Sequence, residues 1–114
     1  RQPIWESFAR NFAICAPGCQ PVGIGIHRDY DGSRSCHHVN RAIDVAGMKC
    51  GQTTYMAIDN GRFSRMVACM RPRLRTIYQQ SHKLSGRRVT RALLTDAHYD
   101  HAHFSIGCYG GSYY

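Results

Sequence analysis

The sequence predicts an α+β fold in which a small antiparallel sheet is flanked by helices and stapled by disulfide bonds. Segments with helical spacing of apolar residues and segments with the alternation of a strand both recur along the chain. Six cysteines are scattered through it. Because 114 residues are one domain's worth of polymer, we expect residues 1–114 to form a single domain.

The first predicted element is a helix from Pro3 to Ala13, followed by Pro17 and Gly18, which end it. Its apolar residues at helical spacing are Ile4, Trp5, Phe8, Ala9 and Phe12. Alternating apolar residues then predict three short strands, over residues 22–26, 41–45 and 53–57. Turn-forming residues predict a loop over 29–35 and turns over 47–51 and 59–61.

A second helix is predicted from Phe63 to Met70, where apolar residues form a stripe typical of core packing. Pro72 interrupts or restarts this helix before Leu74. Two closing strands are predicted over residues 89–95 and 101–106. Arginines interleave the stripe, and we interpret them as a solvated helix face rather than a nucleic-acid groove.

The composition limits the class of protein. With 43% hydrophobic and 19% charged residues, the chain lies in the globular range. No apolar run approaches the roughly 20 residues that cross a bilayer, so we expect no transmembrane segment. The formal net charge of +8 suits an anionic partner, which charge alone does not identify: nucleic acid, a cell surface or an acidic polymer.

Six scattered cysteines in a small basic chain predict a disulfide framework, which forms in the periplasm or outside the cell. The start at Arg1 is what a secreted protein shows after removal of its signal peptide. Six cysteines allow 15 pairings. The pairing predicted here is Cys36–Cys50 around Asp44, Cys69–Cys108 between the second helix and the last strand, and Cys15–Cys19.

Histidines form two clusters that are distant in the sequence, one at His37 and His38 and the other at His98, His101 and His103. One segment offers a histidine and a carboxylate, and the other offers a His-x-His pair whose side chains share one face of a strand. This pattern is typical of a metal site built by two distant segments.

The segment Ser35-Cys36-His37-His38-Val39-Asn40-Arg41-Ala42-Ile43-Asp44 resembles the Ser-x-His-x-x-Gly-x-Ala-x-Asp motif of zinc peptidases of bacterial cell walls. That family includes D-Ala-D-Ala carboxypeptidases, VanX/VanY, phage endolysins and related extensin-like proteins. Asp100, His101 and His103 resemble its downstream Asp-x-x-His and His-x-His motifs. Asn40 replaces the usual glycine, and asparagine tolerates the positive φ that glycine adopts.

The resemblance implies that the sheet carries a zinc site with His37, Asp44 and His103 as ligands and a fourth position for water. It implies Asp100 as the general base and acid, and His101 as a donor to the oxyanion. Arg28 is the candidate for stabilising a substrate carboxylate or developing negative charge. Ser35 is a candidate to orient the site through its hydroxyl.

The function that we expect is hydrolysis of peptide bonds in peptidoglycan stem peptides or cross-links by a monomeric, secreted or periplasmic zinc metallopeptidase. An alternative is a zinc-containing cell-wall or protein-binding domain of the same fold that lacks turnover, as in hedgehog-like relatives. A third interpretation, a basic nucleic-acid or lipopolysaccharide binder, leaves the histidine clusters unexplained and lacks an aromatic-basic stripe, so we expect no nucleic-acid partner.

Overall fold

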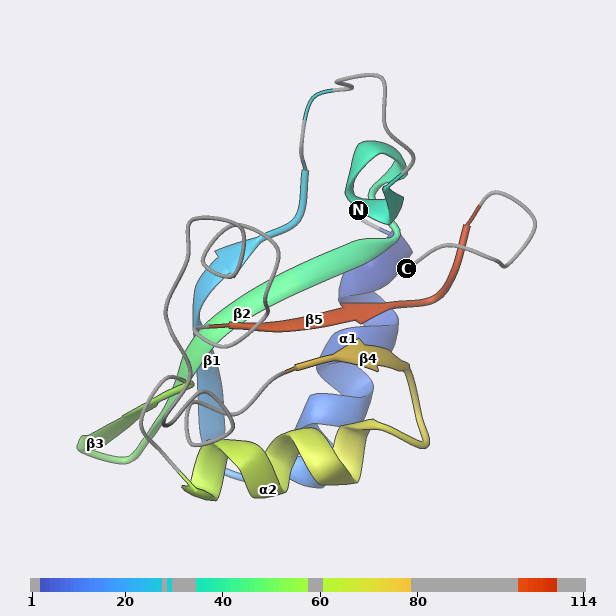
Figure 1. Ribbon diagram of the computed structural model, residues 1–114. Helices are drawn as coiled ribbons and strands as arrows, with labels where there is room; N and C mark the ends of the chain where they lie inside the picture. The colour runs from blue at the N-terminus through green and yellow to red at the C-terminus, as the bar shows by residue number, and fades with distance from the viewer. Residues whose placement is uncertain (1–2, 28, 30–34, 58–60, 79–100, 109–114) are drawn as a thin grey trace, which may run out of the picture.

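A mixed structure of two helices and one antiparallel sheet is present in the computed structural model, which describes residues 3–27, 29, 35–57, 61–78 and 101–108 (Figure 1). The elements are α1 (Pro3–Cys15), β1 (Cys19–Gly25), the 3-10 helix η1 (Cys36–Val39), β2 (Ala42–Cys50), β3 (Thr53–Met56), α2 (Gly61–Met70), β4 (Arg75–Ile77) and β5 (Ala102–Ser105). The strand order is β1-β2-β5-β4, and β3 also pairs with β2. The predicted α+β class is confirmed.

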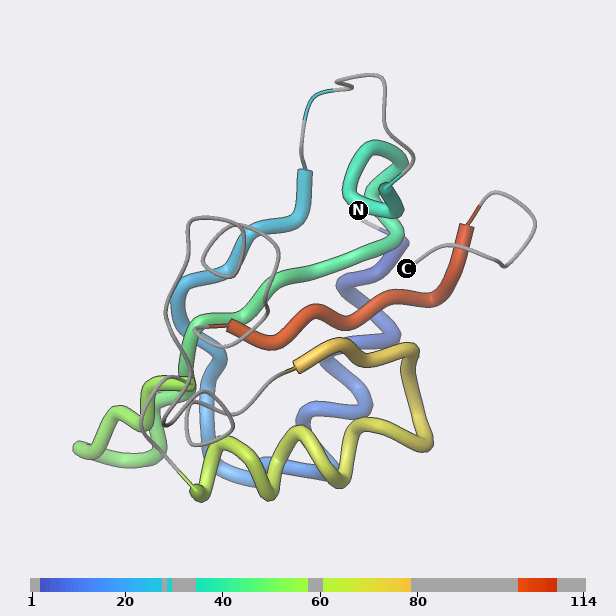
Figure 2. Tube along the Cα trace, in the orientation of Figure 1, coloured from blue at the N-terminus to red at the C-terminus, as the bar shows by residue number. Residues whose placement is uncertain are grey.

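The hydrophobic core lies between the helices and one face of the sheet, with α1 behind the sheet and α2 below it in the view of Figure 2. Phe8 of α1 packs against Phe104 of β5, with ring centroids 5.5 Å apart. Ile43 and Val45 of β2 are fully buried in the same cluster. The apolar stripe of α2 also lies in this core, as predicted: Phe63, Met66, Val67 and Met70.

The pairing register of β2 with β5 gives this part of the sheet two chemically different faces. Ile43 pairs with Phe104, Asp44 with His103, and Val45 with Ala102. Because successive side chains of a strand point to opposite faces, the apolar pairs enter the core while Asp44 and His103 lie together on the other face. Asp44 and His103 therefore form a polar pair on the face of the sheet that is opposite the hydrophobic core.

Most predicted elements in the described residues are confirmed, and one predicted turn is wrong. The turn expected over 47–51 is a continuation of β2, which turns only after Cys50, at Gly51 (φ 63°). Gly47 serves a close approach of strands, since a Cβ there would lie 2.8 Å from the Met56 sulfur. Of the two alternatives at Pro72, interruption is the correct one, because β4 follows and the helix does not restart. Residues 36–39 form η1, which the sequence did not predict, and the strand predicted over 89–95 lies outside the described residues.

Three disulfide bonds are present, but none of the predicted pairs is correct: the bonds are Cys15–Cys69, Cys19–Cys50 and Cys36–Cys108. Cys15 ends α1 and bonds to α2, while Gly18 (φ 78°) turns the chain so that Cys19 pairs with Cys50 in the β1–β2 register. Cys36 lies before the start of the nine-residue strand β2, which is about 27 Å long, and Cys50 is its last residue. Disulfides need Cα atoms about 5.5 Å apart, so Cys36 bonds to Cys108 instead.

No helix in the described ranges is long and apolar enough to cross a bilayer.

Candidate metal centre

The 3-10 helix η1 holds His37 in place through its two ends. At the N-terminal end, the hydroxyl of Ser35 accepts a hydrogen bond from the backbone N–H of His37 at 3.3 Å. At the other end, Asn40 adopts the left-handed conformation (φ 58°), as the replacement of glycine by asparagine predicted. Arg41 N–H then donates to the carbonyl of Cys36 at 2.9 Å, and the chain enters β2.

Three segments bring the predicted ligands together. His37 comes from η1, Asp44 from β2 and His103 from β5. His37 Nε2 lies 3.1 Å from Asp44 Oδ2, and His103 Nδ1 lies 3.1 Å from Asp44 Oδ1. One ligand atom from each residue fits within a spread of 4.8 Å. An ion with bonds of about 2 Å holds its ligand atoms roughly 3–4 Å apart, so this group could hold a metal ion.

The hydrogen bonds of His37 determine which of its nitrogens can bind a cation. Its Nδ1 lies 2.8 Å from the carbonyl oxygen of Ile26. A carbonyl only accepts, so Nδ1 carries a proton, and Nε2 is the nitrogen that can bind a cation when it has no proton of its own. This Nε2 is buried, and Asp44 Oδ2 lies 3.1 Å from it.

A lone pair and a carboxylate oxygen repel each other at this distance unless a positive charge lies between them. His37 and Asp44 therefore share one position for a positive charge, which a proton on Nε2 or a bound metal ion can fill. The carbonyl bond to Nδ1 is also the outer contact that usually orients a metal-ligating histidine. Nothing in the sequence pattern signalled the role of Ile26, because it acts through its backbone.

Asp44 is ionised in this setting. Burial of the carboxyl favours its neutral form, but the hydrogen bond from His103 and the neighbouring His37 and His101 outweigh burial and hold the pKa of Asp44 well below its ordinary value. The carboxylate is thus negatively charged throughout the physiological range, which is the form that binds metal ions.

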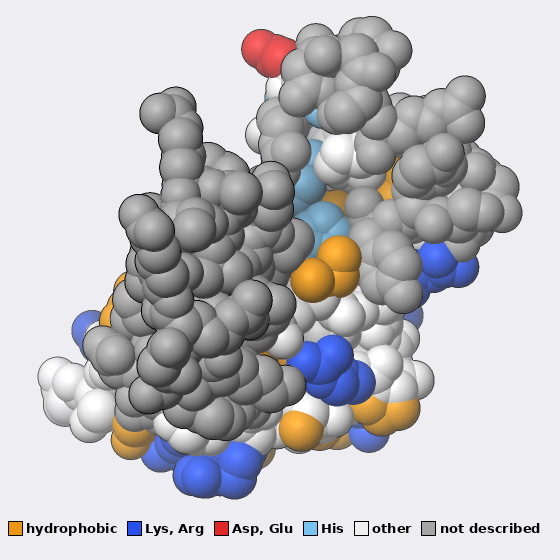
Figure 3. Space-filling model, in the orientation of Figure 1, with side chains coloured by type: hydrophobic (Ala, Val, Ile, Leu, Met, Phe, Trp, Pro, Cys, Tyr) orange, Lys and Arg blue, Asp and Glu red, His pale blue; other side chains and the backbone are white. Residues whose placement is uncertain are grey.

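The histidines of the candidate ligand group are more deeply buried than the neighbouring His101. His37 and His103 are 3% and 4% exposed, and their rings meet edge to face with centroids 4.9 Å apart. His101 is more open: its side chain is 30% exposed and its Nε2 lies 3.9 Å from Asp44 Oδ2. Figure 3 shows histidine side chains gathered on this face, opposite α1. His101 therefore stands beside the group of three, on its solvent side.

Other predicted residues fall differently. Arg28 and Asp100 lie outside the described residues. His38 is half-buried in η1 and does not belong to the group of three. His27 is exposed and contacts Asn40 Oδ1 at 3.2 Å and Asp29 at 3.1 Å.

The disulfide Cys36–Cys108 joins the two ends of this centre. Cys36 precedes His37 directly, and Cys108 follows β5, which carries His103. The bond spans 72 residues of sequence, so it connects ligand segments that the sequence places far apart. It lies in a small buried cluster with Ala42 at the start of β2.

Comparisons with protein-family models, with curated proteins and with solved structures find no match to this chain. The centre is therefore interpreted from its own residues and geometry.

Proposed function

We propose that the protein is a zinc-dependent peptidase that hydrolyses peptide bonds in peptidoglycan stem peptides or cross-links, as the resemblance of its two motifs to cell-wall zinc peptidases implies. The observation that carries the proposal is the convergence of His37, Asp44 and His103 on one small space. Residues 59 positions apart, Asp44 and His103, meet there in strand register.

The ligand set favours zinc among the common metals. Two imidazoles and one carboxylate form a three-residue set of the kind found in catalytic zinc sites, whereas calcium and magnesium prefer oxygen ligands. A Zn²⁺ ion held there would supply a Lewis acid for the scissile carbonyl and a water of lowered pKa. Three protein ligands would leave a position for reactants.

The residues around the ligands support hydrolysis in distinct ways. The hydrogen bond that His37 Nδ1–H donates to the carbonyl of Ile26 fixes the proton on that nitrogen, and burial of His37 and His103 keeps both rings in one orientation. His101, partly exposed beside Asp44, would donate a hydrogen bond to the oxygen that becomes negative during attack. Asp100, its neighbour in the sequence, would take the proton of the attacking water and return it to the leaving amine.

A secreted or periplasmic location is proposed with this function. The three disulfides are compatible with an oxidising compartment. Stem peptides and the wall polymers around them carry carboxylates and phosphates, so the charge of +8 would concentrate the protein on its substrate.

The test is incubation of the zinc-loaded protein with purified peptidoglycan, with the released fragments identified by mass. The masses show which bond is cut and whether cutting is internal or terminal. Asp100→Ala should keep the zinc but lose about 10²–10⁴-fold in rate. Asp96→Ala is the matched control, because it removes a nearby carboxylate of the same segment and should leave the rate unchanged.

Equal rates for the parent and Asp100→Ala would remove Asp100 as the base and make Asp96 or His98 the next candidate. If the zinc-loaded parent releases no fragment from any peptidoglycan, the peptidase proposal fails. A zinc-containing binding domain without turnover would then be the function, and retention of the protein on insoluble peptidoglycan would measure it.

A further inference from the structure

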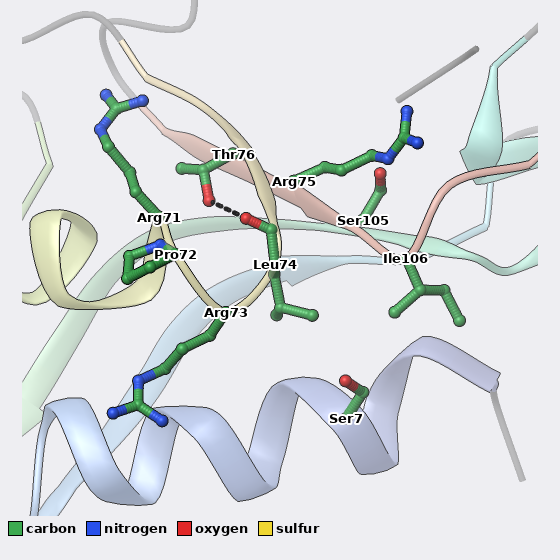
Figure 4. A pocket seen from close by; sticks show the side chains of 9 residues that line it. All are labelled: Ser7, Arg71, Pro72, Arg73, Leu74, Arg75, Thr76, Ser105 and Ile106. Carbon is green, nitrogen blue, oxygen red and sulfur yellow. Dashed lines mark hydrogen bonds between the residues drawn. The ribbon is translucent and has the colours of Figure 1, made fainter. Parts of the chain in front are cut away.

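A second feature lies at the edge of the sheet, away from the metal ligands. An open groove of about 630 Å³ runs between α1 and the segment that links α2 to β4. Its polar lining comes from three arginines and three hydroxyl residues: Arg71, Arg73, Arg75, Ser7, Thr76 and Ser105. Figure 4 shows these side chains around the groove, with Arg73 pointing toward α1 and Arg75 lying over Ser105.

The three arginines alternate along a short stretch of chain, and residues two apart are at most about 7 Å apart at Cα. Arg71 is held by a bond to the carbonyl of Tyr78 at 3.2 Å, a contact that leaves its positive charge uncompensated. Arg75 lies over the backbone of Gly107, where a Cβ would come within 3.1 Å of its Nε. Gly107 also has a positive φ of 77°, so both this close contact and the backbone conformation disfavour a side chain at this position.

Arg73 is exposed and makes no side-chain hydrogen bond or ion pair within the described part of the chain. No carboxylate belongs to the nine residues that line the groove. The lining therefore places three positive charges on different sides of the groove, near hydroxyl donors (Figure 4), and the planar guanidinium groups match the geometry of phosphate oxygens.

Shape and lining distinguish among anionic ligands. Small-molecule sites are usually enclosed and mostly apolar, whereas this groove is open along its length. Proteins that bind single-stranded nucleic acid stack the bases on aromatic side chains, and none of the nine described residues that line the groove is aromatic. The features that remain suit a flexible chain of phosphate groups without bases.

We propose that the groove of Arg71, Arg73 and Arg75 binds the phosphate groups of a phosphodiester polymer of the cell surface, such as a poly(glycerol phosphate). The groove would hold such a polymer whether or not the metal centre hydrolyses peptides. Successive phosphates would contact successive arginines, while Ser7 and Thr76 lie within the same lining to donate hydrogen bonds.

The test measures the fluorescence anisotropy of labelled, soluble poly(glycerol phosphate) with the full chain over a range of salt concentrations. We expect the logarithm of the binding constant to fall linearly with the logarithm of salt concentration. The triple variant Arg71→Gln, Arg73→Gln, Arg75→Gln should bind at least about tenfold more weakly. The matched triple Lys49→Gln, Arg62→Gln, Arg65→Gln removes the same charge elsewhere and should bind within about twofold of the parent.

Arg73→Glu provides a second variant that breaks no side-chain hydrogen bond or ion pair among the described residues, and it should also weaken binding at least about tenfold. Equal losses in the two triple variants would overturn the proposal, because binding would then reflect net charge alone. Competition by polyglutamate or by oligothymidylate at the same charge concentration as the polymer should be weaker than self-competition. Equal competition by polyglutamate would make the site one for general anions, and equal competition by oligothymidylate would make it one for nucleic acid; either result overturns the proposal.

Discussion

The two faces of the same two strands obey different rules. On the helix side, Ile43, Val45 and Phe104 pack into a cluster with α1 and α2, so many apolar contacts share the work of stabilisation. On the other side, Asp44 and His103 meet His37 through a few polar atoms at 3.1 Å. Apolar packing on the first face can survive the loss of one contact, whereas the proposed metal binding on the second face needs all three residues.

This difference follows from the physics of each face. Apolar burial is non-directional and roughly proportional to area, so neighbouring side chains compensate for one another. Metal ligation needs defined atoms at defined distances. Because the period of a strand is two residues, a slip of one residue in the β2–β5 register would exchange the two faces and destroy both.

Substitution of His103 tests the polar face and should have the largest effect. His103→Ala removes one of three ligands, so the zinc content should fall from about one ion per chain to nearly none. The apolar face is untouched, and the circular dichroism spectrum should keep its folded shape. Elemental analysis after dialysis measures the metal, and His27→Ala, which replaces an exposed histidine, should keep it. Full zinc occupancy in His103→Ala would refute the ligand assignment.

Substitution of the next residue tests the other face. Phe104 is fully buried, and Phe104→Ala should lower the free energy of unfolding by about 3–5 kcal/mol. At low denaturant, where the variant still folds, the zinc content should remain close to one per chain. Urea unfolding and elemental analysis on the same samples separate the two effects. If Phe104→Ala lost zinc while still folded, the two faces would not be independent.

Two disulfides allow the candidate metal centre to be compared with another part of the sheet. The bond Cys36–Cys108 joins two segments of the centre, and the bond Cys19–Cys50 lies at the far end of β2. Replacing either Cys36 and Cys108 or Cys19 and Cys50 by serine should lower stability by about 2–4 kcal/mol. Only the first pair should also weaken zinc binding, because only that bond joins the segments of His37 and His103. Competition with a chelator measures the affinity. Equal affinities in the two variants would contradict this role.

Acid should produce the smallest effect, and it should be confined to the polar face. In the metal-free protein the folded pKa of Asp44 is lower than its ordinary value of 3.8, so its ionised form stabilises the fold above about pH 4. That contribution is lost progressively as the pH falls further. Metal-free Asp44→Asn should therefore show a weaker loss of stability below pH 4 than the parent in urea titrations. Parallel curves would assign the acid sensitivity to other carboxylates.

Local patterns predicted the two helices, the strands that carry Asp44 and His103, and the left-handed conformation of Asn40. These features were predictable because residue spacing and backbone preference are properties of short segments. The motif positions of His37, Asp44 and His103 were also predictable, and the structure brings the three together.

What the sequence did not predict depends on contacts between distant segments. The disulfide pairing required knowing that Cys19 and Cys50 share a register, which no single segment reveals. Gly47 was interpreted as a turn because the sequence does not distinguish a glycine that bends the chain from one that admits a neighbouring strand. The carbonyl of Ile26 could not be predicted at all, since every residue has one.

The start of α1 is hydrogen-bonded to Asn40, the residue that caps η1, and it carries a natural fluorophore. The carbonyl of Asn40 accepts a hydrogen bond from Ile4 N–H at 3.2 Å, one of the first donors of the helix, which has no partner inside it. The next residue is Trp5, the single tryptophan of the chain. Trp5 is 36% exposed, and its emission can be recorded during zinc titration and unfolding without any added label.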